Sequence, residues 1–88
     1  MNVEEVITFI DTSMYAKKGK YLSTLQKKII QEIWPGRQSY KQIATKHQYC
    51  PSYLSQDVGP KLWRQLSEVF GERITKAHFR AIIERLVV

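Results

Sequence analysis

Cysteine and histidine are scarce in this sequence. Cys50 is the single cysteine among 88 residues, so no disulfide can form within the chain. The two histidines, His47 and His78, together with this one thiol cannot supply the four ligands of a structural zinc ion. We therefore expect no bound metal and no cofactor, and a fold that depends on side-chain packing alone.

Long apolar runs and catalytic motifs are also missing. No apolar run approaches the roughly 20 residues that cross a bilayer, and the opening MNVEEV carries acids where a secretory signal carries Lys or Arg. These absences predict a cytoplasmic protein that does not enter a membrane. The sequence also lacks a glycine-rich phosphate loop and any credible set of Ser, His and acid. We therefore expect that the chain is not an enzyme.

Acidic residues are few and unevenly placed. The chain holds 14 Lys and Arg against 8 Asp and Glu, a net charge of +6. Glu4, Glu5 and Asp11 precede every base, so the chain from Lys17 onward is more basic than the total implies. A basic surface attracts polyanions because phosphate contacts release counterions. Positive charge can also serve solubility alone, and the charge does not decide between these roles.

Apolar residues recur at helical spacing along most of the chain, and no stretch alternates as a strand would. Hydrophobic residues make up 43% of the chain, an ordinary globular share, and 88 residues suffice for one core. We predict an all-α fold of five to six short helices, forming one domain over residues 1–88. The expected architecture is a small helix–turn–helix bundle, winged-helix-like, with the wing reduced or absent because GERIT (71–75) is too short for a hairpin.

Residues that favour helix N-caps stand before four helical stretches: Asn2, Ser23, Ser39 and Thr75. The first stretch is expected to run to about Ala16, the second to the WPGR motif, the third to Lys46 and the fourth to the end of the chain. Between the first two lies KKGKY (17–21), which predicts an exposed loop whose lysines are either simply solvated or contact phosphate.

Another helical element lies between the third and the last of these stretches. It begins at Pro51 or Ser52, since proline is tolerated at the first helical position. The pair Gly59-Pro60 either kinks or ends this element, and in the second case Pro60 begins a further helix that stops at Gly71.

Residues 39–58 form the candidate functional unit. The small Ala44, beside Ile43, allows the close approach that the two crossing helices of a helix–turn–helix need. After the turn HQYC, Leu54 and Val58 are expected to bury one face of the second helix. The other face carries side chains that can contact base edges and phosphates: Ser52, Tyr53, Ser55 and Gln56.

Basic residues flank this unit and are expected to hold phosphates: Arg37, Lys41, Lys46, Lys61 and Arg64. The sequence therefore predicts a module that binds double-stranded DNA, with the helix 52–58 in the major groove. Two features predict that the module discriminates only modestly among DNA sequences. Asp57 repels phosphate, and no Arg or Lys lies between Ser52 and Val58 to address guanine.

A protein-interaction or self-association module is the second interpretation. The acids of the first helix have no bases near them in sequence, so Glu4, Glu5 and Asp11 are expected to be uncompensated and could meet the basic body of a neighbouring molecule. Exposed Tyr, Trp or Leu side chains would then form the contact surface. The sequence alone leaves both interpretations open.

Three blocks carry a resemblance to a known family: W-x-G at Trp34, Y-x-x-IA at Tyr40, and YLSQDVGPKLWRQLSEVFGERITK from Tyr53 to Lys76. With them, residues 22–84 resemble the amino-terminal helix–turn–helix domain of many cyanobacterial multidomain signalling proteins. In that family the domain commonly precedes a STAND-type NTPase module, WD40 repeats or related parts. The resemblance implies that the chain is the amino-terminal part of a longer protein, that any ATP-dependent role belongs to other parts, and that the ligand is DNA or an effector protein.

Overall fold

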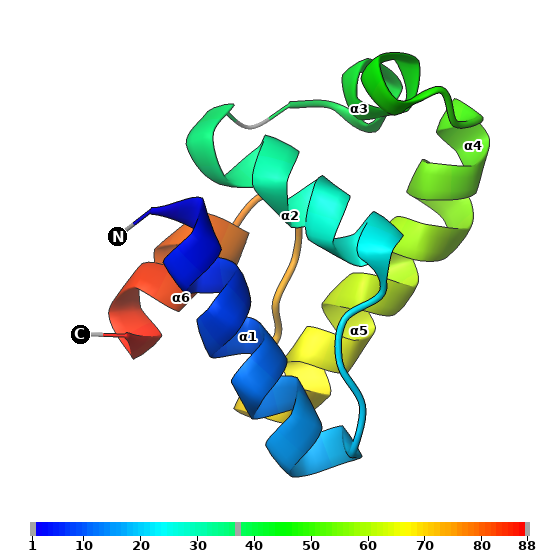
Figure 1. Ribbon diagram of the computed structural model, residues 1–88. Coiled ribbons are helices and arrows are strands. Elements are labelled where there is room, and N and C mark those ends of the chain that lie inside the picture. The colour runs from blue at the N-terminus through cyan, green and yellow to red at the C-terminus, as the bar shows by residue number, and fades with distance from the viewer. Residues whose placement is uncertain (1, 37, 88) are drawn as a thin grey trace.

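Helices joined by short loops make up the protein (Figure 1). The computed structural model describes residues 2–36 and 38–87. In chain order the elements are α1 (Val3–Lys18), α2 (Thr24–Gly36), α3 (Tyr40–His47), α4 (Pro51–Tyr53), the π-helical turn η1 (Leu54–Val58), α5 (Gly59–Phe70) and α6 (Phe79–Leu86). These ranges contain no strand, and residues 72–78 form turns and irregular backbone, so the all-α prediction without a developed wing is confirmed. No helix in them is long and apolar enough to span a membrane.

Reciprocal capping bonds begin three of the helices where the sequence predicts them. In each, the first residue's side-chain oxygen accepts from the backbone N–H three residues on, and that residue's side chain accepts in return. The pairs are Asn2 with Glu5, Ser23 with Gln26, and Ser39 with Gln42. A cap of this kind stabilises a helix by about 1 kcal/mol, which is why local sequence suffices to place these three starts.

The last helix begins later than predicted, so Thr75 is not its cap. Helix α6 starts at Phe79, and the Thr75 side chain lies 3.1 Å from Nδ1 of His78 in a turn before it. The chain just upstream is fastened to α5, because the N–H of Ile74 donates to Oγ of Ser67 at 2.8 Å and Ile74 is buried. This anchoring accompanies irregular backbone at residues 73–75, and the helix forms only after the turn.

Gly59 and Pro60 neither end the helix nor begin a new one. Helix continues from Pro51 to Phe70 through α4, η1 and α5 (Figure 1). The N–H of Gly59 donates to the carbonyl of Leu54, five residues back, which is the bond of a π-turn. In a regular α-helix the ring of Pro60 would collide with the carbonyl four residues before it, and the wider turn relieves that collision.

The aromatic side chain of Phe79 joins the core of the molecule. Its ring lies 5.2 Å from the ring of Trp63 in α5 and 6.0 Å, edge-on, from the ring of Trp34 in α2. Around it, side chains from all of the longer elements are fully buried, including Ile10, Ile30, Ile43, Leu62 and Leu66. This shared core fixes α3 and the helix 51–70 relative to the rest of the chain.

Tyr40 locks α3 against the helix 51–70. Its hydroxyl oxygen accepts a hydrogen bond from Nε1 of Trp63 at 2.8 Å, and burial raises the pKa of Tyr40 while this bond opposes the rise. The ring lies so close to Gly59 that a Cβ there would overlap it. The DVGPKLW block therefore has a structural role at this helix junction.

Candidate nucleic-acid interface

A sharp turn connects α3 to the helix that begins at Pro51. Gln48 takes a left-handed backbone conformation with φ of 62°, and its N–H and that of Tyr49 both return to the carbonyl of Ala44. Ala44 and Ile43 are fully buried, so the two helices approach closely, as a helix–turn–helix requires. The helix–turn–helix geometry predicted for residues 39–58 is present.

The polar side chains predicted to face a ligand all lie on the surface. Ser52, Tyr53, Ser55 and Gln56 are exposed. Leu54, in their midst, is fully buried, and Val58 is partly buried. The helix thus has its apolar side anchored in the core and a broad polar side directed to solvent.

Cys50 lies at the start of this helix and contacts the candidate interface. Its Sγ is 3.1 Å from Oγ of Ser52, and this hydrogen bond is the main cause of a lowered pKa for the exposed thiol. The Ser52 hydroxyl therefore has a local partner, and it can still turn to a ligand because it both donates and accepts.

Three of the predicted phosphate-binding residues have their charge available. Lys41 on α3, and Lys61 and Arg64 on α5, are exposed, and none of them takes part in an ion pair within the described residues. Arg37 lies outside the described residues. Lys61 and Arg64 follow the polar face along the same helix, while Lys41 belongs to the neighbouring one.

Lys46 is exposed as well, but it is paired with an acid of the fold. Its Nζ donates to Oε1 of Glu32 at 2.9 Å, and Nε2 of His47 lies 3.5 Å from the other carboxylate oxygen. The Glu32 carboxylate is buried, and the hydrogen bond from Lys46 lowers its pKa against the opposing effect of burial. The charge of Lys46 therefore balances a buried acid, and the pair links α2 to α3. The sequence does not reveal this contact, because the two residues are 14 positions apart.

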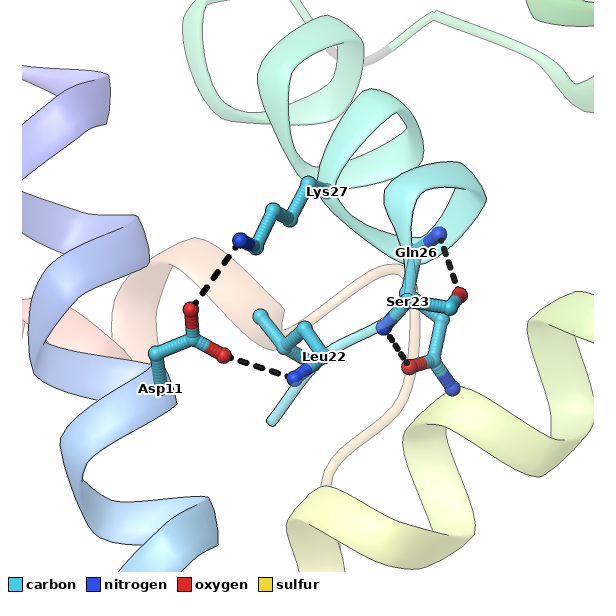
Figure 2. Close-up of polar contacts among 5 residues, drawn as sticks. All are labelled: Asp11, Leu22, Ser23, Gln26 and Lys27. Carbon is cyan, nitrogen blue, oxygen red and sulfur yellow. Dashed lines mark hydrogen bonds and ion pairs between the residues drawn. The ribbon is translucent and has the colours of Figure 1, made fainter. Parts of the chain in front are cut away.

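Two of the three acids of the first helix are also engaged, and for Asp11 the expectation that it is uncompensated is wrong. Asp11 accepts the N–H of Leu22 at 2.6 Å through one oxygen and pairs with Nζ of Lys27 at 3.3 Å through the other (Figure 2). Glu5 is part of the cap at Asn2. Asp11 and Glu5 therefore act mainly in folding, which weakens the electrostatic reason for self-association. Glu4 is exposed, and its side chain takes part in no hydrogen bond or ion pair within residues 2–36 and 38–87.

A groove of about 450 Å³ runs beside the polar face. One side is the loop between α1 and α2, with Lys20 and Tyr21, and the other is the helix 51–70, with Tyr53, Asp57 and Lys61. The site residues predicted from sequence did not include Lys20 and Tyr21, although the basic stretch KKGKY was a signal for them. What the sequence could not show is that this loop packs next to the second helix of the motif.

Comparison with known proteins gives one family. A family model described as "vWA-MoxR associated protein N-terminal HTH" matches residues 1–86. No curated protein gives a significant match, and neither does any solved structure. The family description agrees with the amino-terminal helix–turn–helix domain that the sequence resembles, and it extends that agreement over α1 and α6.

Proposed function

The chain belongs to the family of N-terminal helix–turn–helix domains of vWA-MoxR associated proteins, and on that basis we propose that it is a binding module for double-stranded DNA and has no catalytic role. The observation that carries the proposal is the exposed polar side of the helix 51–70, which the buried Leu54 holds in place. Exposed Lys and Arg side chains lie near it on the same helix and on α3. An α-helix with its side chains is about 10–12 Å across and fits the major groove, which is about 12 Å wide.

The roles of the residues follow from their chemistry. The amide of Gln56 can pair with adenine, and the hydroxyls of Ser52 and Ser55 can meet either kind of base edge. The charges of Lys41, Lys61 and Arg64 would hold phosphates and set affinity independently of sequence. Since no Arg lies on the exposed side of residues 52–58, the module discriminates modestly among sequences.

We also propose that the module works as the amino-terminal part of a longer cytoplasmic signalling protein. The family description names an N-terminal domain, and the sequence resembles the domain that precedes STAND-type NTPase modules and WD40 repeats in cyanobacterial proteins. Any ATP-dependent chemistry would then belong to those other parts, and residues 1–88 would supply recognition.

Binding of the purified chain to a random duplex library, followed by fluorescence anisotropy over a salt series, tests the proposal. We expect log affinity to fall linearly with log salt, by about 0.9 per phosphate contact. Lys41→Gln should reduce that slope by about one contact and weaken all sequences alike. Absence of any binding at low salt would contradict the proposal, and capture of a protein partner by the same surface would favour the interaction module instead.

Base contacts need a separate variant. Gln56→Ala should cost about 1–3 kcal/mol on the preferred duplex selected from the library and leave the salt slope unchanged, since it removes a base contact and no charge. Thr8→Ala, at an exposed position of α1, serves as the control and should bind like the unmodified chain. Equal affinities of Gln56→Ala and the control would remove Gln56 from the interface.

A further inference from the structure

The groove beside the polar face shares Tyr53 and Lys61 with the interface described so far, but its other wall, the α1–α2 loop, has no role in that interface. We propose that the groove receives one phosphate strand of the bound duplex, and that Lys20 and Tyr21 of the α1–α2 loop are a second set of backbone contacts. The inference rests on the proposed function, because it adds a contact to the same DNA. It assigns a role to a loop outside the helix–turn–helix.

The dimensions of a helix in the major groove place the DNA strands. A helix about 10–12 Å across nearly fills a groove about 12 Å wide, so the two backbones must pass directly along its sides. One side of the helix 51–70 faces α3, where Gly59 meets Tyr40. Another side, with Tyr53 and Lys61, borders the groove, and the α1–α2 loop stands across from it. A strand passing on that side would run between the loop and the helix.

The groove offers the donors that a phosphate strand needs. Lys20 and Tyr21 line it on one side and Tyr53 and Lys61 on the other, and the ammonium and phenol groups of these side chains can donate to phosphate oxygens. Tyr21 is 59% exposed and Tyr53 is 46% exposed, so both aromatic side chains are accessible to a ligand. Tyr21 also stacks on Tyr15 with ring centroids 4.7 Å apart, which supports its ring in that position.

The loop is held firmly enough to act as a fixed wall. Asp11 binds the backbone of Leu22 and the side chain of Lys27, so the loop is tied to α1 and to the start of α2 (Figure 2). Leu22, a residue of the loop, is buried. Nε2 of Gln26 donates to Oε1 of Gln65 at 3.0 Å, which joins the start of α2 to α5 across the groove. The two walls therefore keep a set separation before any ligand arrives.

Asp57 gives the proposal a sharp test because its charge has the wrong sign for phosphate. It is exposed and lies on the same wall as Tyr53 and Lys61. If a phosphate strand occupies the groove, neutralising this carboxylate must strengthen binding. If the groove received a basic protein segment, the same change would weaken binding of that segment.

The test compares single variants of the chain with the selected duplex, each first checked for an unchanged circular dichroism spectrum. Lys20→Gln is expected to weaken binding about three- to tenfold and to lower the salt slope by about 0.9. Lys17→Gln, with the same charge change at an exposed site that does not line the groove, is the matched control and should have a smaller effect. Asp57→Asn should tighten binding severalfold, and Tyr21→Phe should weaken it because the hydroxyl is lost.

The outcomes separate this inference from the proposed function. If the unmodified chain binds no duplex, both are wrong. If it binds and Gln56→Ala weakens it, while Lys20→Gln behaves like Lys17→Gln, the duplex uses the polar face and the loop contact alone is overturned. An unchanged or weakened affinity in Asp57→Asn would likewise overturn the passage of a strand through the groove.

Discussion

Gly59 determines how closely α3 can approach the helix 51–70. The Tyr40 hydroxyl and the ring carbon that bears it occupy the space where any larger residue would place its Cβ, and the hydroxyl oxygen accepts the hydrogen bond from Nε1 of Trp63. Glycine normally weakens a helix interior. Here its missing side chain is the condition for the contact that positions the candidate interface.

Gly59→Ala is therefore expected to destabilise the fold by about 1–3 kcal/mol, because the added methyl overpacks the junction and displaces Tyr40 from Trp63. Urea unfolding followed by tryptophan fluorescence measures the loss. Gly36→Ala is the control, since a Cβ there meets nothing within 4 Å. A Gly59→Ala variant as stable as Gly36→Ala would show that Tyr40 is not held as described.

The sequence indicates a helix junction at the Gly59-Pro60 pair, but it does not show why residue 59 must be a glycine. The side chain that demands a glycine at position 59 is Tyr40, which is distant in sequence and belongs to another helix. Composition and local spacing carry no information about such a contact. The N-caps at Asn2, Ser23 and Ser39 were predictable because their partners lie three residues away.

At the scale of elements, a buried acid ties α2 to α3. Glu32 on α2 faces Lys46 and His47 on α3, and Lys46 is the main cause of its lowered pKa. A carboxyl whose pKa is lowered by folding stabilises the native state at pH values above its unfolded pKa. That contribution disappears as the pH falls through the folded pKa, below the ordinary value of 4.5.

Glu32→Gln should consequently lower stability at neutral pH, and the gap to the unmodified chain should close as the pH drops below about 4.5. Unfolding curves in urea over a pH series give both quantities. Glu84→Gln, which removes only an exposed pair with Arg80, should change stability by less than about 1 kcal/mol at any pH. A pH-independent gap for Glu32→Gln would rule out a linked titration at this site.

The helical elements were largely predictable from sequence, with one misplaced start. Thr75 has the right chemistry for a cap, yet the chain before it is fastened to α5 through Ser67 and the buried Ile74. Tertiary anchoring overrides the local preference there. A helix start of this kind depends on contacts between side chains that meet only after folding, and the periodicity of apolar residues does not predict such contacts.

At the scale of the whole molecule, Phe79 connects three helices. It brings α6 against Trp34 of α2 and Trp63 of α5, and it is completely buried. A domain of this length has a total stability of roughly 0.05–0.15 kcal/mol per residue. One aromatic side chain in this position therefore accounts for a large share of it.

Phe79→Ala is expected to cost about 3–5 kcal/mol. Both tryptophans contact this ring, so fluorescence and circular dichroism should report one common, shifted transition in urea. Ile82→Ala, at a partly buried position of the same helix, should cost less. Two separate transitions in the unmodified chain would mean that α6 and the helix–turn–helix do not share a cooperative core.

For the candidate site, the sequence predicted which face of residues 52–56 is exposed but not what surrounds it. Burial of Leu54 follows from local spacing. The engagement of Lys46 by Glu32 and the position of Lys20 beside the helix depend on the packing of the whole chain. Charge counted along the sequence therefore could not show that Lys46 pairs with Glu32, nor that the KKGKY loop lies beside the second helix of the motif.

The π-turn η1 has a consequence for the rotational phase of the helix. Tyr53, Asp57, Lys61 and Gln65 all line the groove, each four residues after the last. In an uninterrupted α-helix, with about 100° per residue, twelve residues would rotate Gln65 about 120° away from Tyr53. A π-turn absorbs one extra residue, which reduces that drift to about 20°. The single wide turn thus brings four residues into phase along one wall. Deleting one residue from Leu54–Val58 would make the helix regular, and the eleven remaining steps of about 100° would keep Tyr53 and Gln65 about 20° apart, so the wall tolerates that deletion but not an insertion in α5.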